Sequence, residues 1–487
     1  MTQDAAIIAA LLTPLAGAVL IVLSHRHPNV RETVTLVTGG ALFLTVASLV
    51  PDVFAGASPE AGGFVIAPGL EITFRLEPLG MLFALVASGL WLVNSIYSIG
   101  YMRGNKEHRQ TMFYACFAVA IGATMGVAFS ANLVTLFLFY EVLTLSTYPL
   151  VTHKATEEAV RGGRIYLMIL LGTSMVLLLP AIIWTYVLAG TTTFAAGGIL
   201  AGKADGILVA ILLALFAFGI GKAAIMPFHR WLPAAMVAPT PVSAFLHAVA
   251  VVKAGVFSVM KIVIYIFGID LLATTGQGTW LLYVAAATIL IASIVAMTRD
   301  NLKARLAYST VSQLSYVVLG AALANTLGIL GGSMHIAMHA VGKITLFFCA
   351  GAIYTAAHKT KVSELAGLGR KMPFTFAAFA VGAISIIGLP PMGGTWSKWY
   401  LALGAMEADQ FILVVVLMIS SLLNIAYLLP IPFRAFFVRP GGDDAAGGIA
   451  EAPLACLIAI GITATACVLL FFFADALYNL LQLMKLR

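Results

Sequence analysis

Ionisable side chains are uncommon in the middle of long apolar stretches, yet this sequence contains a row of them. Glutamate, lysine and histidine can take up and release protons, and a charged side chain at the centre of a bilayer costs at least ~2.5–3.5 kcal/mol. Such residues usually face a protein interior or a water-filled path. We predict a proton pathway through the membrane that consists of Glu141, Lys222, His247, Lys253, His335, His339, Lys343 and Lys398.

Three of these residues share one stripe of a predicted helix. His335, His339 and Lys343 are spaced i, i+4 and i+8 in the segment MHIAMHAVGKITLF, and residues four apart lie above one another on a helix. Two histidines at this spacing can also bind one metal ion. No cysteine or nearby carboxylate completes a ligand set, so we expect a proton relay and no metal site.

Two of the lysines lie beside interruptions of the apolar segments. Lys222 precedes Pro227, and Lys398 follows a Pro-Pro pair. Proline removes a backbone donor and clashes with the preceding turn, and broken helices at membrane depth line ion paths in transporters. Two such segments in corresponding halves of a chain indicate an inverted repeat. For Glu141 and Lys222 the alternative is a static ion pair between helices.

The segment between these interruptions carries further ionisable residues. His247 and Lys253 are six residues apart and lie on nearby faces of a regular helix, although His247 could instead be a hydrogen-bonded core residue. Lys261 is nearer the outer end, where its side chain could extend to the interface, so we leave it out of the pathway. The polar run from Tyr308 to Gln313 could hold water, or it could join helices through hydrogen bonds worth ~0.6–2 kcal/mol each.

The composition indicates a membrane protein. The 487 residues are 61% hydrophobic and 10% charged, with a mean hydropathy of +1.02, whereas soluble proteins average about 25% charged residues. Most of the basic residues lie between the apolar segments, so the net charge of +7 does not indicate a nucleic-acid partner. The sequence has no phosphate-binding loop, dinucleotide fingerprint or cysteine cluster. We therefore expect no cofactor, and an ion gradient or a redox partner must supply the energy.

The apolar segments predict an all-α membrane protein, because a membrane-spanning helix needs about 20 apolar residues. The first segment lacks a basic region before it and a cleavage site after it, so we interpret it as a span and not as a signal peptide. Lysine and arginine number 18 in the odd-numbered loops and 4 in the even-numbered loops and termini. This places the odd-numbered loops in the cytoplasm and both termini outside. The fourteen predicted spans are roughly 5–24, 33–50, 78–99, 111–129, 132–151, 165–188, 207–227, 241–266, 279–298, 304–323, 328–357, 373–403, 410–433 and 452–482.

Five stretches resemble the antiporter-like family shared by respiratory complex I, membrane-bound hydrogenases and Mrp-type cation/proton antiporters. The resemblance implies two inverted five-helix repeats with broken helices seven and twelve, and one proton half-channel in each repeat. The single membrane domain would divide into 1–110, 111–266, 279–433 and 452–487. The matching stretches are IYSIGYMRG at 96–104, FYEVLTLSTYPL at 139–150, FGIGKAAIMPFHRWLPAAMVAPTPVSAFLHAVAVVKAGVF at 218–257, NLKARLAYSTVSQLSY at 301–316 and GLPPMGGTWSKW at 388–399.

The same resemblance implies a role for each matching residue. Glu141 corresponds to the glutamate of helix five, and Lys222 to the helix-seven lysine that pairs with it. Lys253 corresponds to the bridging lysine of helix eight, and Lys343 and Lys398 to the lysines of helices eleven and twelve. The two histidines of helix eleven match the family's polar positions more loosely.

The stretch APTPVSAFLHAVAVVKAGVF is most similar to the D-type chain of Mrp antiporters and to its hydrogenase relatives. This implies a proton-translocating subunit of a multisubunit Na⁺/proton antiporter in the bacterial inner membrane, with homologous antiporter-like and small helical subunits as partners. The pieces PTPVSA and LHA also resemble the largest membrane chain of complex I. The alternative is therefore a proton-pumping subunit of a redox complex, either complex I-like or a membrane-bound hydrogenase. A passive anchor is disfavoured, because several buried lysines would be a costly scaffold.

Overall fold

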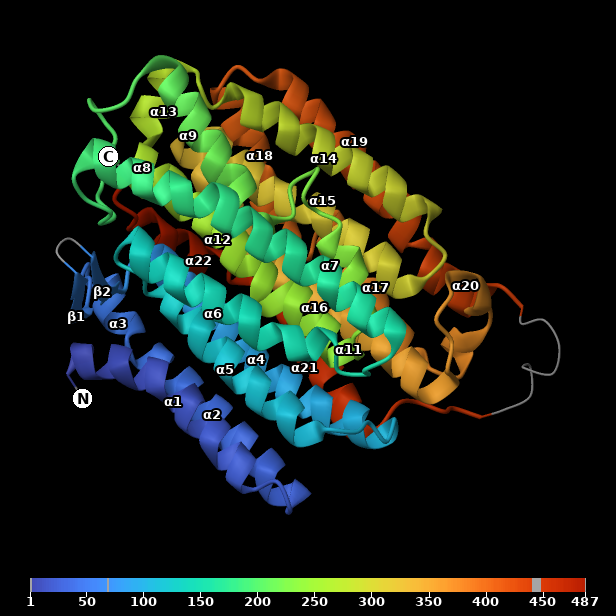
Figure 1. Ribbon diagram of the computed structural model, residues 1–487. Coiled ribbons are helices and arrows are strands. Elements are labelled where there is room, and N and C mark those ends of the chain that lie inside the picture. Colours follow the sequence, from blue (N-terminus) through green and yellow to red (C-terminus); the bar gives the residue numbers. More distant parts are fainter. Residues whose placement is uncertain (1, 68–69, 440–447, 487) are drawn as a thin grey trace.

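The computed structural model describes residues 2–67, 70–439 and 448–486. These residues form a bundle of long, roughly parallel helices, with the two ends of the chain at one end of the bundle (Figure 1). The opposite end carries the turns at 24–27, 105–109, 152–156, 299–301 and 358–372, and we call it the basic end. Arg487, which contributes to the predicted charge count of the termini, lies outside the described residues.

Helices account for nearly all of the regular structure. The N-terminal part contains α1 (Gln3–Leu23), α2 (Pro28–Ser48), α3 (Val50–Phe54), α4 (Pro78–Gly104), α5 (Gln110–Ala128), α6 (Leu133–Val151), α7 (Glu157–Thr173), η1 (Ser174–Leu178) and α8 (Leu179–Ala189). The middle part contains α9 (Gly206–Gly219), η2 (Gly221–Ala223), α10 (Trp231–Ala234), η3 (Ala235–Val237), α11 (Thr240–Ala244), η4 (Phe245–Val249), α12 (Val251–Ile262), η5 (Val263–Phe267) and α13 (Ile269–Thr275). The C-terminal part contains α14 (Thr279–Thr298), α15 (Leu302–Ala322), α16 (Thr326–Ala357), η6 (Val362–Glu364), η7 (Leu368–Arg370), α17 (Pro373–Ile387), α18 (Gly394–Glu407), α19 (Phe411–Leu428), α20 (Pro430–Phe437), α21 (Leu454–Phe472) and α22 (Ala474–Gln482).

The prediction of a helical membrane protein is confirmed. Eleven helical segments of the described chain are long and apolar enough to cross a membrane. The other three predicted spans also correspond to helices: α9, α15, and the pair α17 and α18. The structure is compatible with fourteen crossings, while the exact number and the inverted relation of the two halves stay predictions.

Two helices are interrupted where the prolines and glycines predicted it. After α9 the chain forms the short 3₁₀ turn η2, and Ala224 then adopts a left-handed conformation with φ of 54°. After α17, Gly388 has φ of 85°, and the helix resumes only at α18. A left-handed glycine is a common end of a helix because it has no Cβ to clash. Both breaks free backbone carbonyl groups inside the bundle.

A β-hairpin is the one element type that the sequence analysis missed. Strand β1 (Glu60–Ala67) pairs antiparallel with β2 (Leu70–Arg75) in a segment that we expected to be a loop. The hairpin lies at the end of the bundle that carries both termini (Figure 1). It connects α3 with α4, and Phe74 forms an isolated bridge to Ser130 just before α6.

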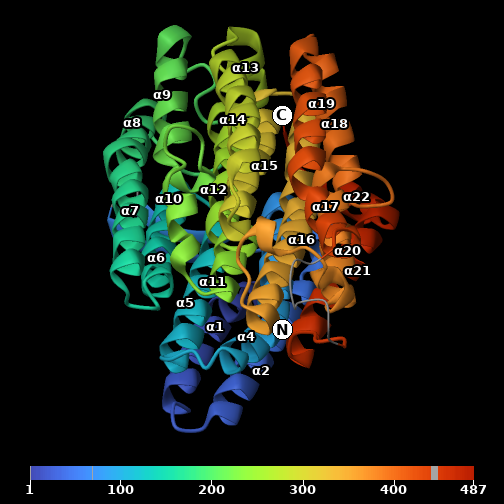
Figure 2. The same cartoon turned by 90° about the vertical axis from the view of Figure 1, so that its right-hand side faces the viewer.

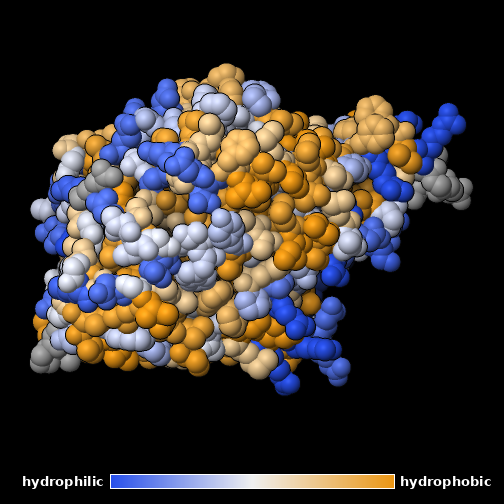
Figure 3. Space-filling view, turned by 90° about the horizontal axis from the view of Figure 1, so that it is seen from above, coloured by the Kyte–Doolittle hydropathy of each residue, from blue (hydrophilic) through white to orange (hydrophobic). Residues whose placement is uncertain are grey.

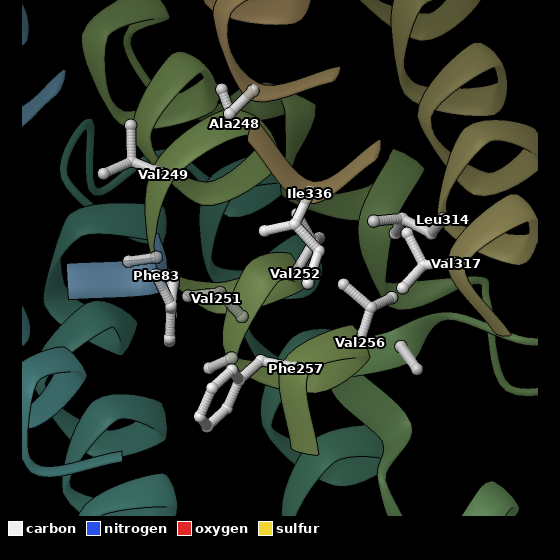
Figure 4. Packing of buried hydrophobic residues seen from close by; sticks show 14 of the residues in the cluster. Phe83, Ala248, Val249, Val251, Val252, Val256, Phe257, Leu314, Val317 and Ile336 are labelled. Carbon is white, nitrogen blue, oxygen red and sulfur yellow. The ribbon is translucent and has the colours of Figure 1, made fainter. Parts of the chain in front are cut away.

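Two helices form the centre of the bundle. The segment Thr240–Phe267, which includes α12, and the segment Thr326–Ala357, which is α16, are buried throughout their most apolar windows. Figure 2 shows α12 and α16 with helices on either side of them. In Figure 4, Val251 and Val256 of α12 lie between Phe83 of α4 and Leu314 of α15. Neighbouring helices therefore shield the polar groups within these windows from lipid and from bulk solvent.

The outer surface is apolar in a way that suits lipid. Long aliphatic and aromatic side chains are exposed on many helices, such as Leu23, Val187, Ile207 and Leu454. Figure 3 shows broad apolar areas on one face, with the most hydrophilic residues toward the ends of the bundle. In water such areas would be an aggregation hazard, whereas in a bilayer they face hydrocarbon.

The close approach of α12 to the first break gives a prediction for stability. A Cβ atom added to Gly255 would overlap the backbone of Lys222 and Ala223. We expect Gly255→Ala to lower the free energy of unfolding by about 1–3 kcal/mol, as overpacking does in other cores, and to lower the thermal midpoint in detergent. Gly172→Ala on α7 is the matched control, because nothing lies within 4 Å of its added Cβ. Equal midpoints for the two variants would contradict this account of the packing.

Candidate functional site

The predicted pathway residues lie on six elements around the bundle centre. Seven of the eight are buried, and Lys398 on α18 is partly buried. They come from α6, η2, η4, α12, α16 and α18. Each buried lysine has a hydrogen-bond acceptor, as the next paragraphs describe.

Lys222 lies in the first break and contacts α6. Its Nζ donates to the carbonyl oxygen of Tyr140 at 2.9 Å and to Thr144 Oγ1 at 2.5 Å. Nζ also lies 3.2 Å from the centre of the Tyr140 ring, a position that favours cation–π attraction. The backbone N–H of Lys222 donates to Tyr140 Oη at 3.1 Å. The helix that carries Glu141 therefore holds Lys222 through neutral groups.

Glu141 does not form the expected ion pair. Its carboxylate is 8% exposed, and neither oxygen has a hydrogen-bond partner within the described part of the chain. No ion pair within 4.0 Å joins it to Lys222 among the residues that the structure describes. The two side chains are thus not in direct contact in this structure, and the pairing that the family resemblance implies stays a prediction. Lys222 instead uses acceptors one residue before and one turn after Glu141.

Lys253 connects the two central helices. Its Nζ forms a hydrogen bond with His339 Nδ1, so α12 and α16 meet through two ionisable side chains. Lys253 is fully buried and His339 is 1% exposed. One turn along α16, the ring of His335 stacks on that of His339 with centroids 5.7 Å apart. The predicted polar stripe therefore meets Lys253 at its middle residue.

His335 continues the path to the second break. Its Nδ1 lies 2.9 Å from Ser397 Oγ on α18, and its ring stacks on Tyr316 of α15. The next residue, Lys398, donates to the carbonyl oxygen of Ile387 at 2.9 Å and to Ser421 Oγ at 3.3 Å. Ile387 is the last residue of α17, and its carbonyl is free because the helix stops there. The second break thus supplies an acceptor for Lys398.

Lys343 lies away from this line. Its Nζ donates to Ser309 Oγ on α15 at 2.6 Å, and Tyr427 Oη lies 2.8 Å from the same oxygen. The sequence analysis placed Lys343 with His335 and His339 on one stripe of the pathway. In the structure, Lys253 contacts His339, His339 contacts His335, and His335 contacts Ser397. Lys343 lies four residues after His339 along α16, whereas His335 lies four residues before it.

His247 has no polar contact of its own. It lies in the π-helical turn η4, and its ring packs 4.9 Å from the ring of Phe347. Neither ring nitrogen has a hydrogen-bond partner in the part of the chain that the structure describes. The structure therefore does not bring His247 into hydrogen bonds with the other pathway residues, and its role stays a prediction.

Lys261 does not extend to the interface. It is 1% exposed, and its Nζ lies 3.4 Å from Glu77 Oε2 and donates to the carbonyl oxygen of Ser130 at 2.5 Å. Glu77 also lies 3.8 Å from Arg75 of the hairpin. Glu77, which directly precedes α4, and Arg75 at the end of the hairpin therefore provide the charge environment of this lysine.

Several polar side chains that surround the predicted residues were missed from the sequence. Tyr316, Ser397 and Tyr427 lie in apolar segments, where such residues are common, and only their proximity to ionisable side chains distinguishes them. The polar run at 308–313 did carry a signal. Ser309 accepts from Lys343 of α16, and Ser312 bonds Ser293 of α14 at 2.9 Å, so the run joins helices through hydrogen bonds, while its use in holding water stays a prediction.

No group of three or more metal-binding side chains comes together within residues 2–67, 70–439 and 448–486. His335 and His339 have Lys253 and a serine as neighbours, and neither neighbour is a good ligand for a metal held by histidine. The site is thus a set of buried ionisable groups, in which Lys253 bonds His339, the rings of His339 and His335 stack, and the other lysines donate to hydroxyl and carbonyl oxygens.

Comparison with curated proteins shows relatives in several membrane complexes. The chain is 34% identical over 391 residues to NADH-quinone oxidoreductase subunit N of Desulforudis audaxviator, with 79% of this chain and 76% of that protein covered. It is 31% identical over 445 residues to a Na(+)/H(+) antiporter subunit of Alkalihalophilus pseudofirmus. That match covers 85% of this chain and 54% of the relative, so the chain spans about half of that longer protein.

Solved structures show the same fold. A chain of the Mrp complex from Dietzia sp. DQ12-45-1b superposes with a TM-score of 0.87 at 22% identity, and the match covers 99% of this chain and 97% of that one. A chain of the membrane-bound sulfane sulfur reductase, an archaeal respiratory membrane complex, gives the same values. A family model described as NADH:quinone oxidoreductase/Mrp antiporter, TM, matches residues 130–424, which include all eight predicted pathway residues. The chain therefore belongs to the NADH:quinone oxidoreductase/Mrp antiporter family of transmembrane subunits.

Proposed function

We propose that this chain moves protons across the membrane as the Mrp D-type subunit of a multisubunit Na⁺/proton antiporter. The observation that supports it most is the hydrogen bond between Lys253 and His339, which joins two fully buried helices through groups that can exchange a proton. The stacked rings and Ser397 continue from there to Lys398. A structural scaffold would not need a row of basic groups at the bundle centre.

In this proposal Glu141 controls the charge of Lys222. Lys222 now bonds Tyr140 and Thr144, which flank Glu141 on α6. Opposite charges 4 Å apart attract by about 4 kcal/mol at an effective dielectric constant of about 20, and the attraction weakens as the lysine Nζ moves away from the carboxylate. That is enough to decide whether Lys222 holds its proton. Movement between the two positions would therefore load and unload the lysine.

The proton then passes toward the second half of the bundle. Lys253 gives it to His339, and His335 relays it toward Ser397 and Lys398. Water must connect Lys222 with Lys253, and we place His247, with its two free ring nitrogens, beside that connection. The Lys398 amine lies against the second break, where a change of backbone shape can open or close its access to solvent.

The proposed location is the bacterial inner membrane, with the basic end in the cytoplasm and both termini outside. The loops with many lysines and arginines lie at one end of the bundle, opposite the termini (Figure 1). Cytoplasmic loops of membrane proteins carry an excess of these residues. Homologous antiporter-like subunits and small helical subunits would cover part of the apolar surface, and lipid the rest.

A second candidate is a proton-pumping subunit of a redox complex. It is favoured by the 34% identity to an NADH-quinone oxidoreductase subunit over most of both chains. The same pathway residues would serve, because only the source of energy differs. The subunits that assemble with this chain distinguish the two candidate functions.

The proposed roles of Glu141 and Lys222 predict the loss of transport. Glu141→Gln and Lys222→Ala should each lower proton flux in vesicles that contain the complete complex by at least about 100-fold, the lower end of what a positioned proton-transfer group contributes. Flux is measured with a pH-sensitive dye after an Na⁺ pulse. Expression and thermal midpoint should stay near the wild-type values.

Glu158→Gln is the matched control, because Glu158 is exposed at the start of α7. We expect wild-type flux from it. Wild-type flux from Glu141→Gln or Lys222→Ala would show that the protons take another route. It would also favour the alternative that the chain is only a passive anchor.

The source of energy predicts the composition of the complex. Purification through a tag on this chain should yield homologous antiporter-like subunits and small helical subunits, identified by mass spectrometry, without iron in stoichiometric amount. Iron–sulfur proteins in the purified complex would instead establish the redox candidate.

A further inference from the structure

Lys343 occupies a position that the proposed line from Lys253 to Lys398 does not explain. It lies one helical turn beyond His339, on the side of α16 that leads to the basic end, whereas His335 and Ser397 lie on the other side. Lys343 is fully buried. Hydrogen bonds connect Lys343 to groups other than those between Lys253 and Lys398.

Three helices contribute to that connection. Lys343 Nζ of α16 donates to Ser309 Oγ of α15 at 2.6 Å. Tyr427 Oη of α19 lies 2.8 Å from Ser309 Oγ and also forms a hydrogen bond with Asn424 Oδ1. All four side chains are at most 1% exposed. They form an unbroken series of hydrogen bonds that starts at the lysine.

The series leads to the basic end of the bundle. Ser309 is seven residues after the first residue of α15, about 10 Å along the helix axis. Tyr427 is the last residue but one of α19, and its carbonyl oxygen accepts from Arg305 at 3.1 Å. Arg305 in turn donates to the carbonyl oxygen of Arg299 in the turn before α15. The Tyr427 hydroxyl therefore lies about two helical turns inside the basic end, and the Arg305 side chain lies nearer to the turn before α15.

The chemistry of the four groups gives the series a direction. An ammonium group can only donate, and an amide oxygen can only accept. Tyr427 has one hydroxyl hydrogen, which can point to Ser309 or to Asn424. When it points to Asn424, the Ser309 hydrogen can point to Tyr427, and all the hydrogen bonds then run from Lys343 to Asn424. Once Lys343 has lost a proton and can accept, rotation of the two hydroxyl groups reverses the bonds among Tyr427, Ser309 and Lys343.

We propose that Ser309 and Tyr427 relay protons between Lys343 and the water at the basic end, so that the second half of the bundle has its own connection to that side. This inference rests on the proposed function. In the outward step, Lys343 gives a proton to Ser309 Oγ as Ser309 gives its own to Tyr427 Oη. Tyr427 then gives its hydroxyl hydrogen to a water molecule beside Asn424. Lys343 becomes neutral, one hydronium ion forms, and both hydroxyl groups are restored.

Asn424 is a positioning residue in this scheme. Its Oδ1 orients the Tyr427 hydroxyl, and its Nδ2 has no hydrogen-bond partner within the described residues. An unpartnered buried amide nitrogen costs free energy unless water meets it. The water molecule that takes the proton would therefore lie beside Asn424 Nδ2.

A purely structural role is the competing explanation, because hydroxyl groups also join helices in membranes. Tyr427→Phe and Ser309→Ala each remove one relay hydroxyl, whereas Ser309→Thr keeps a hydroxyl group at position 309. The matched controls are Tyr97→Phe and Ser315→Ala. Tyr97 is a buried tyrosine that donates to the Phe348 carbonyl of α16, and Ser315 is a buried serine on α15 that bonds its own helix.

The experiment measures proton flux and thermal midpoint for these variants in the complete complex. We expect Tyr427→Phe and Ser309→Ala to lower flux at least about tenfold, less than the roughly 100-fold of a fixed proton-transfer group, since water can partly replace a lost hydroxyl. Ser309→Thr and both controls should keep flux within about twofold of wild type. The thermal midpoint of each relay variant should fall no further than that of its control.

Two results would overturn the relay. One is flux from Tyr427→Phe equal to that from Tyr97→Phe, and the other is flux from Ser309→Thr as low as that from Ser309→Ala. Glu141→Gln in the same assay keeps this test separate from the proposed function. If Glu141→Gln stops flux while Tyr427→Phe does not alter it, only the relay is wrong. If Glu141→Gln transports normally, the proposed function fails and the relay fails with it.

Discussion

An ammonium group inside an apolar bundle is stable only if nearby lone pairs accept its hydrogens, and this constraint accounts for much of the arrangement. Lys222 uses a carbonyl and a hydroxyl oxygen of α6, Lys253 uses a histidine nitrogen, and Lys343 uses a serine. Lys261 uses Glu77 and a carbonyl, and Lys398 uses the carbonyl that the second break frees. Of these five lysines, only Lys261 has a carboxylate of the described residues within 4.0 Å of its Nζ. The other four therefore depend on neutral acceptors, which stabilise an ammonium group less than an ion pair would.

This dependence explains why the helices must be broken and tightly packed. A regular helix uses its own carbonyl oxygens, whereas the break after Ile387 leaves one for Lys398. Glycine at 255 lets α12 approach the backbone at Lys222 closely, so the first break lies directly against one of the two central helices. Four basic groups on weak acceptors within one region cannot all be charged at low cost. The region is therefore suited to holding a few protons that move, and not to fixing many charges.

The sequence was sufficient for the class of fold and for the ionisable residues, because apolar runs and the cost of buried charge are local signals. Proline and glycine also gave the positions of both breaks. It was not sufficient for the contacts. The free carboxylate of Glu141, the position of Lys343 off the line from Lys253 to Lys398, and the Glu77 partner of Lys261 depend on how distant helices approach one another. The β-hairpin was missed because a short two-stranded element between apolar spans resembles a loop.

The central claim is that Lys253 and His339 pass protons between the two halves as one unit. The most direct test is proton flux through the complete complex for Lys253→Met, His339→Gln and the double variant. We predict that each single variant lowers flux by at least about 100-fold and that the double variant is no slower, because residues that act as a unit are not additive. Near wild-type flux in either single variant, or losses that multiply in the double variant, would contradict the account.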